Sequence, residues 1–158
     1  MTVTEASAPG KLFIAGEYAV VTPGHPSILV ALDQFITVSL EEADTTGTIR
    51  SAQSGGLPIP WTREEDQLVI DQSENPFLYI TEAVKVTERF IKESGIPLSY
   101  FHLSVKSELD NASGKKYGLG SSGAVTVATI KALLKFYAID PEFELVYKLA
   151  SLAHLSVK

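Results

Sequence analysis

The stretch Lys115-Lys116-Tyr117-Gly118-Leu119-Gly120-Ser121-Ser122-Gly123-Ala124 leads directly into an apolar pattern with helical spacing. That pattern runs from Val125 to Phe136 and predicts a helix that begins at the end of the glycine-rich loop. The first backbone N–H groups of a helix have no partner within it, and the helix dipole adds partial positive charge at that end. We therefore expect the loop to bind an anion, and a phosphate group is the best candidate.

Two other interpretations of this loop stay open. Gly118, Gly120 and Gly123 satisfy the dinucleotide-binding pattern G-x-G-x-x-G, and Asp140 follows at a suitable distance for its acidic residue. However, a polar stretch precedes the loop where that motif requires an apolar strand, and Asp140-Pro141 is typical of a helix start. The loop could also be a glycine-rich turn with a serine cap. A Walker loop is excluded, because no G-x-x-x-x-G-K-[ST] occurs.

A second motif lies near the start of the chain, where residues 8–21 read Ala-Pro-Gly-Lys-Leu-Phe-Ile-Ala-Gly-Glu-Tyr-Ala-Val-Val. On their own, these residues predict a turn, then an apolar strand headed by Lys11, and then a break at Gly16-Glu17-Tyr18. Lys11 alone is also compatible with a solvated charge at the end of a strand. Residues 8–21 therefore indicate a function only when they are considered together with the glycine-rich loop.

Together, the two motifs resemble those of the kinase superfamily that includes galactokinases, homoserine kinases, mevalonate kinases and phosphomevalonate kinases. Within this superfamily, the sequence at residues 8–21 and 115–123 is similar to that of the bacterial phosphomevalonate kinases. Tyr18 stands where galactokinases and mevalonate kinases usually have histidine. The loop also lacks the leading proline of the general pattern and has Gly123 where alanine is common, and both departures are typical of that branch.

This resemblance implies an ATP-dependent kinase that uses Mg²⁺ and converts 5-phosphomevalonate to 5-diphosphomevalonate in the mevalonate route to isoprenoids. It implies Lys11 as the catalytic residue near the acceptor oxygen, and Ser122 as the metal ligand. Glu17 and Tyr18 are implied, with Lys11, as substrate-binding residues, although both equally suit a role in closing the turn. The residues implied to hold the ATP phosphates are Gly118, Leu119, Gly120, Ser121, Ser122 and Gly123.

Two other functions remain as alternatives: a mevalonate kinase, which phosphorylates an alcohol, and a non-catalytic nucleotide-binding relative. The presence of both Lys11 and the Ser121-Ser122 pair argues against a loss of catalysis. Acceptor specificity is not decided by the two motifs.

We expect residues 1–158 to be the N-terminal ATP-binding domain of a longer kinase, with its C-terminal domain absent. The superfamily carries a catalytic aspartate and a third glycine-rich motif further along, and neither occurs in this sequence. The sequence also ends at Ser156-Val157-Lys158, within an apolar helical pattern. We therefore expect the chain alone to be inactive and to self-associate through uncovered apolar surface.

Composition restricts the class of protein. A chain of 158 residues, 45% hydrophobic and 20% charged, can form one sizeable core. The net charge of −6 argues against nonspecific binding to nucleic acid, and the lack of cysteine excludes disulfides and thiolate metal sites. The sequence shows neither a signal-peptide pattern nor an apolar run of membrane-spanning length, so we expect a cytoplasmic protein with no membrane or nucleic-acid partner.

Apolar alternation predicts strands at residues 2–6, 11–14, 28–32, 35–42, 67–71 and 99–106. The segment 51–62, which contains Gly55-Gly56 and two prolines, is expected to form a surface loop or a long hairpin connection. Trp61 within it is expected to anchor packing.

Three helices complete the expected set. Asn75-Pro76 predicts the start of the first and Gly95 its end. The second follows the glycine-rich loop, and Asp140-Pro141 predicts the start of the third. This order predicts an α+β fold with a mixed sheet covered by helices on one side. The resemblance implies the same fold class, as a truncated N-terminal domain of the ribosomal protein S5 domain 2-like type.

Overall fold

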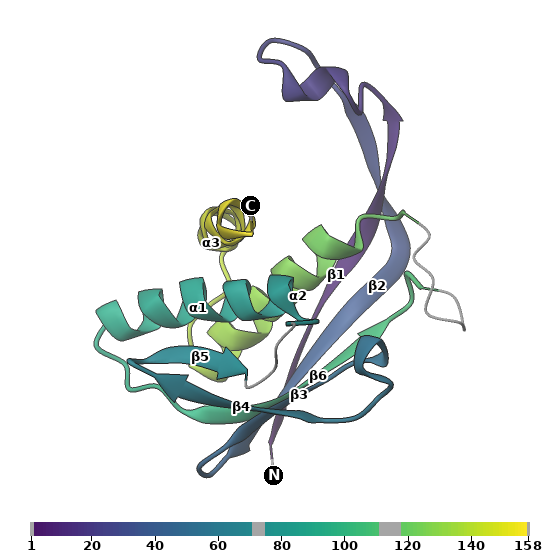
Figure 1. The fold of residues 1–158 in the computed structure, drawn as a ribbon. Coiled ribbons are helices and arrows are strands. Elements are labelled where there is room, and N and C mark those ends of the chain that lie inside the picture. The colour runs from purple at the N-terminus through teal and green to yellow at the C-terminus, as the bar shows by residue number, and fades with distance from the viewer. Residues whose placement is uncertain (1, 71–74, 111–117, 158) are drawn as a thin grey trace.

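A curled six-stranded mixed sheet with helices on one side forms the described part of the chain (Figure 1). The structure is a computed structural model that describes residues 2–70, 75–110 and 118–157. The strands are β1 (Val3–Ala15), β2 (Ile28–Ala43), β3 (Gly47–Arg50), β4 (Ile59–Glu64), β5 (Gln67–Ile70) and β6 (Tyr100–Ser107). The α-helices are α1 (Leu78–Glu93), α2 (Ser121–Phe136) and α3 (Phe143–Ser156), and short 3₁₀ turns lie at Ala19–Val21 and Ala52–Ser54. The expected α+β fold class is confirmed.

The strand order is β1-β2-β6-β3-β4-β5, and the sheet is mixed because β3 runs parallel to β6 while the other neighbours are antiparallel. Helices α1 and α2 lie side by side over one face, and α3 packs on both of them as a further layer (Figure 1). Alternate residues of β2 and β6 point into the core between sheet and helices, because strand side chains alternate between faces. The fully buried members are Val38, Leu40, Phe101 and Leu103.

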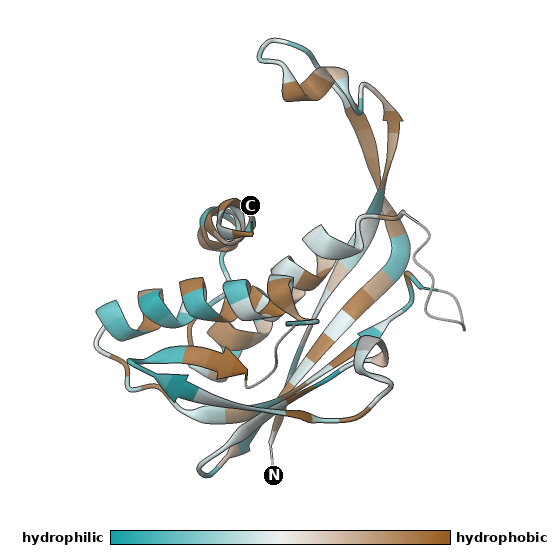
Figure 2. Cartoon of the chain, in the orientation of Figure 1, coloured by the Kyte–Doolittle hydropathy of each residue, from teal (hydrophilic) through white to brown (hydrophobic). Residues whose placement is uncertain are grey.

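The paired ends of β1 and β2 extend beyond the rest of the sheet as a two-stranded arm, which we define as residues 11–31 (Figure 1). Strand β6 pairs with β2 only from Ile36 onward, so no third strand of the described residues supports the arm. The strands of the arm consist mainly of hydrophobic residues (Figure 2). Those that are 42–60% exposed are Leu12, Ile14, Ile28, Leu29 and Val30. The arm therefore presents apolar surface on a slender support.

The strand predictions are partly confirmed. The segments predicted at 2–6 and 11–14 form one continuous strand, as do those at 28–32 and 35–42; β3 was not predicted at all, and residue 71 lies outside the described residues. The loop predicted for 51–62 is wrong at its end, because β4 begins at Ile59 and includes Pro60. Trp61 is confirmed as a packing anchor: it is 1% exposed, and its Nε1 donates a hydrogen bond of 3.1 Å to the Phe101 carbonyl.

The helix boundaries follow the expected signals with one exception. The Asn75 side chain accepts a 2.8 Å hydrogen bond from the Phe77 N–H at the start of α1, and Gly95, with φ of 82°, follows its end. The expectation that Asp140 caps α3 is wrong, because Glu142 is the residue that precedes its first turn. The Asp140 carbonyl instead accepts a hydrogen bond from the Glu142 N–H, which extends the connection before the helix begins.

Candidate phosphate-binding site

The glycine-rich loop enters α2 through left-handed backbone. Gly118 and Gly120 have φ of 74° and 75°, values that side chains disfavour, so glycine is required for this entry. The first hydrogen bond of the helix runs from the Ala124 N–H to the Gly120 carbonyl, at 3.1 Å. The three preceding N–H groups, on Ser121, Ser122 and Gly123, have no hydrogen-bond partner among the described residues. Three donors and the positive end of the helix dipole therefore meet at one place.

The start of α2 also lacks a side-chain cap. The start of α1 is stabilised by Asn75, whereas the residue that precedes α2 is Gly120, which has no side chain to serve as a cap. The hydroxyls of Ser121 and Ser122 likewise make no hydrogen bond within the described part of the chain. The interpretation of the loop as a serine-capped turn therefore does not fit, and the free donors remain available to an anion.

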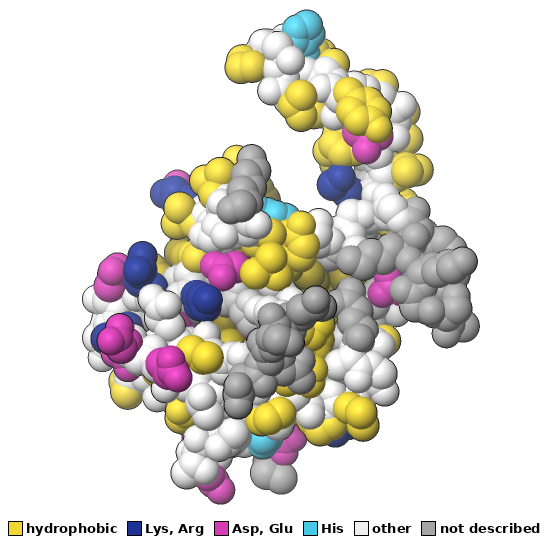
Figure 3. Space-filling view, in the orientation of Figure 1, with side chains coloured by type: hydrophobic (Ala, Val, Ile, Leu, Met, Phe, Trp, Pro, Cys, Tyr) yellow, Lys and Arg dark blue, Asp and Glu magenta, His cyan; other side chains and the backbone are white. Residues whose placement is uncertain are grey.

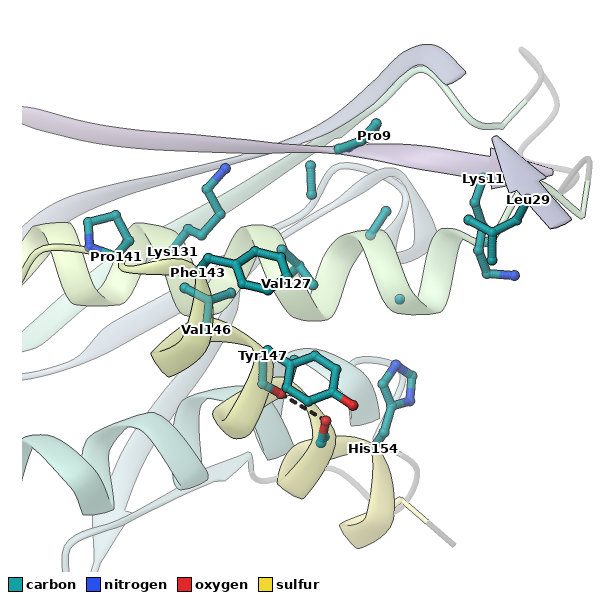
Figure 4. Close-up of a pocket in the computed structure, with 16 residues that line it drawn as sticks. Pro9, Lys11, Leu29, Val127, Lys131, Pro141, Phe143, Val146, Tyr147 and His154 are labelled. Atoms are coloured by element: carbon teal, nitrogen blue, oxygen red, sulfur yellow. Dashed lines mark hydrogen bonds between the residues drawn. The ribbon is translucent and has the colours of Figure 1, made fainter. Parts of the chain in front are cut away.

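Lys11 lies against this loop. Its backbone N–H donates a 2.8 Å hydrogen bond to the Leu119 carbonyl, and its aliphatic chain crosses Gly120 so closely that a Cβ there would lie 2.7 Å from Lys11 Cγ. The Lys11 Nζ lies 4.2 Å from the centre of the Phe13 ring. Figure 4 shows the side chain hanging from β1 beside the first turn of α2. The two sequence motifs, more than 100 residues apart, therefore meet in space.

A cavity of about 860 Å³ adjoins this meeting point, between β1, α2 and α3 (Figure 4). Its walls are mainly apolar, with Val127, Phe143 and Tyr147 among them. The basic side chains that line it are Lys11, Lys131 and His154, and no described Asp or Glu side chain does so. Lys131 donates a 2.8 Å hydrogen bond to the Ser7 carbonyl. The local charge is thus basic, although the chain carries a net charge of −6.

Glu17 and Tyr18 lie at the tip of the arm, away from the loop. Both are exposed, Tyr18 by 85%, and neither lines the cavity. Gly16, with φ of 80°, makes the turn there, and its carbonyl accepts a 3.0 Å hydrogen bond from the Val20 N–H. The space-filling view shows the arm overhanging the hollow beside α3 (Figure 3). A role of these two residues in substrate binding stays a prediction.

A second polar cluster lies at the other end of α2, and no sequence pattern indicated it. We call Arg63, Glu88, Ser99 and Tyr137 the Glu88 cluster. Glu88 accepts hydrogen bonds from Arg63 at 2.5 Å and from the Tyr137 hydroxyl at 2.8 Å, and Arg63 also donates to the Ser99 carbonyl at 2.6 Å. Burial raises the pKa of Glu88, against the opposing effect of Arg63, and burial also raises the pKa of Tyr137.

Lys115 and Lys116, the first residues of the glycine-rich stretch, lie outside the described residues. Within them, no group of three or more His, Asp or Glu side chains is placed to hold a metal ion. None of the described helices combines the length and hydrophobicity needed to cross a bilayer.

The start of α2 thus combines three N–H donors without a partner among the described residues with a lysine from strand β1, an arrangement that suits an anion. The family model for the GHMP kinases N terminal domain matches residues 79–158. The chain therefore belongs to the GHMP kinase family.

The relatives of the chain include a phosphomevalonate kinase and several mevalonate kinases. A phosphomevalonate kinase from Streptomyces sp. (strain CL190) is 40% identical over 156 residues, which cover 92% of this chain and 41% of the relative. A mevalonate kinase from Thermococcus sibiricus is 32% identical, over 97% of this chain and 45% of the relative. The chain thus spans less than half the length of these relatives.

A solved structure supports the same fold. The Streptococcus pneumoniae phosphomevalonate kinase in complex with phosphomevalonate and AMPPNP matches with a TM-score of 0.76 and 28% identity, over 97% of this chain and 42% of that one. The expected resemblance to the GHMP superfamily is confirmed, and so is the fold class.

Proposed function

We propose that this chain provides the ATP-phosphate-binding part of a kinase that converts 5-phosphomevalonate to 5-diphosphomevalonate. The contact of Lys11 with Leu119 and Gly120 carries this proposal, because it brings a lysine beside three N–H donors that have no partner among the described residues. The similarity to a phosphomevalonate kinase supports the choice of substrate.

The loop would bind ATP through its backbone. The N–H groups of Ser121, Ser122 and Gly123 have no partner in the described part of the chain and lie at the positive end of α2, so they suit the oxygens of a nucleotide phosphate. The remaining predicted loop residues, Gly118 and Leu119, shape the entry, and Gly120 leaves room for Lys11.

Mg²⁺ fits the same place with Ser122 as its protein ligand. The hydroxyl lies in the first turn of α2 without a hydrogen-bond partner among the described residues, and Mg²⁺ bound to a nucleotide takes few protein ligands besides phosphate oxygens and waters. When bound, the ion would neutralise charge on the transferred phosphate.

Lys11 would stabilise the charge that moves between donor and acceptor. Phosphoryl transfer requires alignment and charge neutralisation more than covalent chemistry, and Lys11 is held against the loop by its own backbone. A phosphate monoester has a second pKa of about 6, so 5-phosphomevalonate is largely ionised at neutral pH and needs no general base. An acceptor that is already ionised therefore suits a site that offers a lysine, Lys11, held in place to stabilise negative charge.

Mevalonate kinase is the second candidate, because several curated relatives have that activity. The two candidates are separated by a coupled assay of ADP release with 5-phosphomevalonate and with mevalonate, on the kinase that contains this chain. We expect faster turnover with 5-phosphomevalonate. Faster turnover with mevalonate would assign the second candidate instead.

We also propose that the 158-residue chain self-associates through the arm. Ile14 and Ile28 are each 60% exposed there, beside other apolar side chains. Light scattering at several concentrations should show association, which Ile14→Ser with Ile28→Ser should weaken. Leu57→Ser is the matched control, because Leu57 is 69% exposed but lies off the arm. A monomer at all concentrations would contradict the proposal.

A further inference from the structure

We infer that Gly10 is a positioning residue whose missing side chain holds Lys11 against the phosphate loop. This inference rests on the proposed function, in which Lys11 acts on the transferred phosphoryl group. The sequence places Gly10 only in a turn before Lys11, and nothing in its spacing distinguishes this glycine from one that merely turns the chain.

The pairing of β1 with β2 breaks at Gly10. Pro9 pairs with Phe35 and Lys11 pairs with Ala31, so that one residue of β1 lies opposite three residues of β2. Immediately after this break, the Lys11 N–H donates its hydrogen bond to the Leu119 carbonyl, across to the loop. The break in the pairing thus lies directly beside the N–H that reaches from β1 to the loop.

The space around Gly10 shows why this position lacks a side chain. A Cβ on Gly10 would lie 2.7 Å from the Leu119 carbonyl oxygen, the same atom that accepts the Lys11 hydrogen bond. It would also lie 2.6 Å from Cδ2 of Leu109, which is 1% exposed. The φ of Gly10 is not in the left-handed region, so space alone imposes the requirement here. Any side chain would push the loop away from β1.

Gly120 completes the contact from the opposite side. A Cβ there would lie 2.7 Å from Lys11 Cγ and 3.3 Å from its Cε, so the lysine stem lies directly on the backbone at the start of α2. The two glycines therefore have complementary roles: Gly10 admits the loop carbonyl, and Gly120 admits the lysine. Gly10 is the cleaner position to test, because Gly120 also has a positive φ.

The test is Gly10→Ala in the kinase that contains this chain. Displacement of reacting groups by a fraction of an ångström to 1 Å lowers catalysis steeply, so we expect kcat to fall by about 10-fold or more, with a smaller change in KM for ATP. A fall confined to KM, or unchanged kinetics, would overturn the inference.

A second readout does not depend on activity. Acetylation of Lys11 by acetic anhydride, measured by mass spectrometry relative to the exposed Lys106, should increase in Gly10→Ala, because the lysine stem is lifted off Gly120. An unchanged ratio would contradict the inference. If the wild type transfers phosphate to neither acceptor and the ratio still rises, the proposed function fails while the positioning geometry stands.

The matched control is Gly47→Ala. Gly47 is also buried without a positive φ, and a Cβ there would overlap the Trp61 ring, far along the sheet from Lys11. This variant should lose stability yet keep the wild-type kcat and the wild-type acetylation ratio. An equal loss of kcat in this control would show that general destabilisation explains the effect at Gly10.

Adding Leu109→Ala to Gly10→Ala separates positioning from packing and provides a variant if Gly10→Ala folds poorly. It removes the side-chain overlap but leaves the overlap with the Leu119 carbonyl. We expect kcat to stay low and the acetylation ratio to stay high in the double variant, because the overlap with the Leu119 carbonyl remains. Recovery of kcat together with stability would show that Gly10 serves only to accommodate Leu109.

Discussion

The polar groups at the two ends of α2 differ in whether they have hydrogen-bond partners. At the start, the N–H groups of Ser121, Ser122 and Gly123 have no partner among the described residues. At the end, the Tyr137 hydroxyl lies in the Glu88 cluster, where it donates to Glu88 and accepts a 3.1 Å hydrogen bond from the Ser99 N–H. One end of the helix is open to a ligand, and the other is closed by the protein itself.

This difference suggests that the end of α2 contributes mainly to stability and that its start is suited to binding. Buried polar groups are nearly always hydrogen-bonded, since an unpaired group costs free energy, and the Glu88 cluster follows this rule. Arg63 adds stacking on the rings of Trp61 and Tyr100, at 4.9 and 4.8 Å from their centres. The free donors at the other end are stabilised by no such partners, which is the expected condition of a site that binds an anion.

The largest expected effect is on stability, at the closed end. Glu88→Ala leaves the Arg63 guanidinium buried beside no carboxylate, and removal of one partner of a buried ion pair typically costs about 3–5 kcal/mol. Urea unfolding of the variant and the wild type measures the loss. Tyr137→Phe serves as a milder control at about 1–2 kcal/mol, because it removes the hydrogen bonds of the hydroxyl with Glu88 and with the Ser99 N–H but leaves the ion pair intact.

The comparison also requires that Glu88→Ala leave the chemistry unchanged. The kcat of the folded fraction should equal that of the wild type, because the cluster does not touch the loop. A kcat that falls in proportion to the lost stability would show that the two ends of α2 are coupled, and the division between them would then be wrong.

Substitution of Lys11, at the open end, should lower kcat and leave stability largely unchanged. Lys11→Ala is expected to lower kcat by about 10²-fold or more with little change in the affinity for ATP, because the charge acts mainly in the transition state. Steady-state kinetics and calorimetric titration with Mg-ATP measure the two quantities.

Lys11→Met separates the charge from the stem that crosses Gly120. It keeps an aliphatic chain on the glycine, so it should be as inactive as Lys11→Ala if the ammonium group is what matters. Full activity in Lys11→Met would reduce Lys11 to a packing residue.

Much of the open end was predictable, because its signals are local. The glycines of the loop, the helix after it and the apolar strand headed by Lys11 are each encoded within a few neighbouring residues. The meeting of Lys11 with the loop came from the family resemblance, and no spacing along the chain would have revealed it. The role of Lys11 in catalysis and the roles of Glu17 and Tyr18 in substrate binding remain predictions.

The closed end could not be predicted, because its members come from four separate segments. Arg63 and Glu88 read as ordinary surface charges, one beside a proline-containing strand and the other on a helix. Only the packing of α1 on the sheet brings them together, 25 residues apart, and buries the Glu88 side chain to 2% exposure. The missed strand β3 has a similar cause, because four residues with one long apolar side chain give too little alternation to recognise.

The smallest expected effect is a pH dependence of the free energy of unfolding, which tests whether the buried Glu88 side chain is stabilised more in its protonated or in its ionised form. Burial raises the pKa of Glu88 above its usual value of 4.5, so the folded state holds this proton more tightly than the unfolded state does. Its contribution to stability is therefore fully present below pH 4.5 and is lost as the pH rises through the raised pKa. Glu88→Gln cannot titrate, so the unfolding free energy of the wild type minus that of this variant should decrease as the pH rises through that window. An increase would mean that the attraction of Arg63 outweighs the cost of burial, and that the cluster is held by its ion pair.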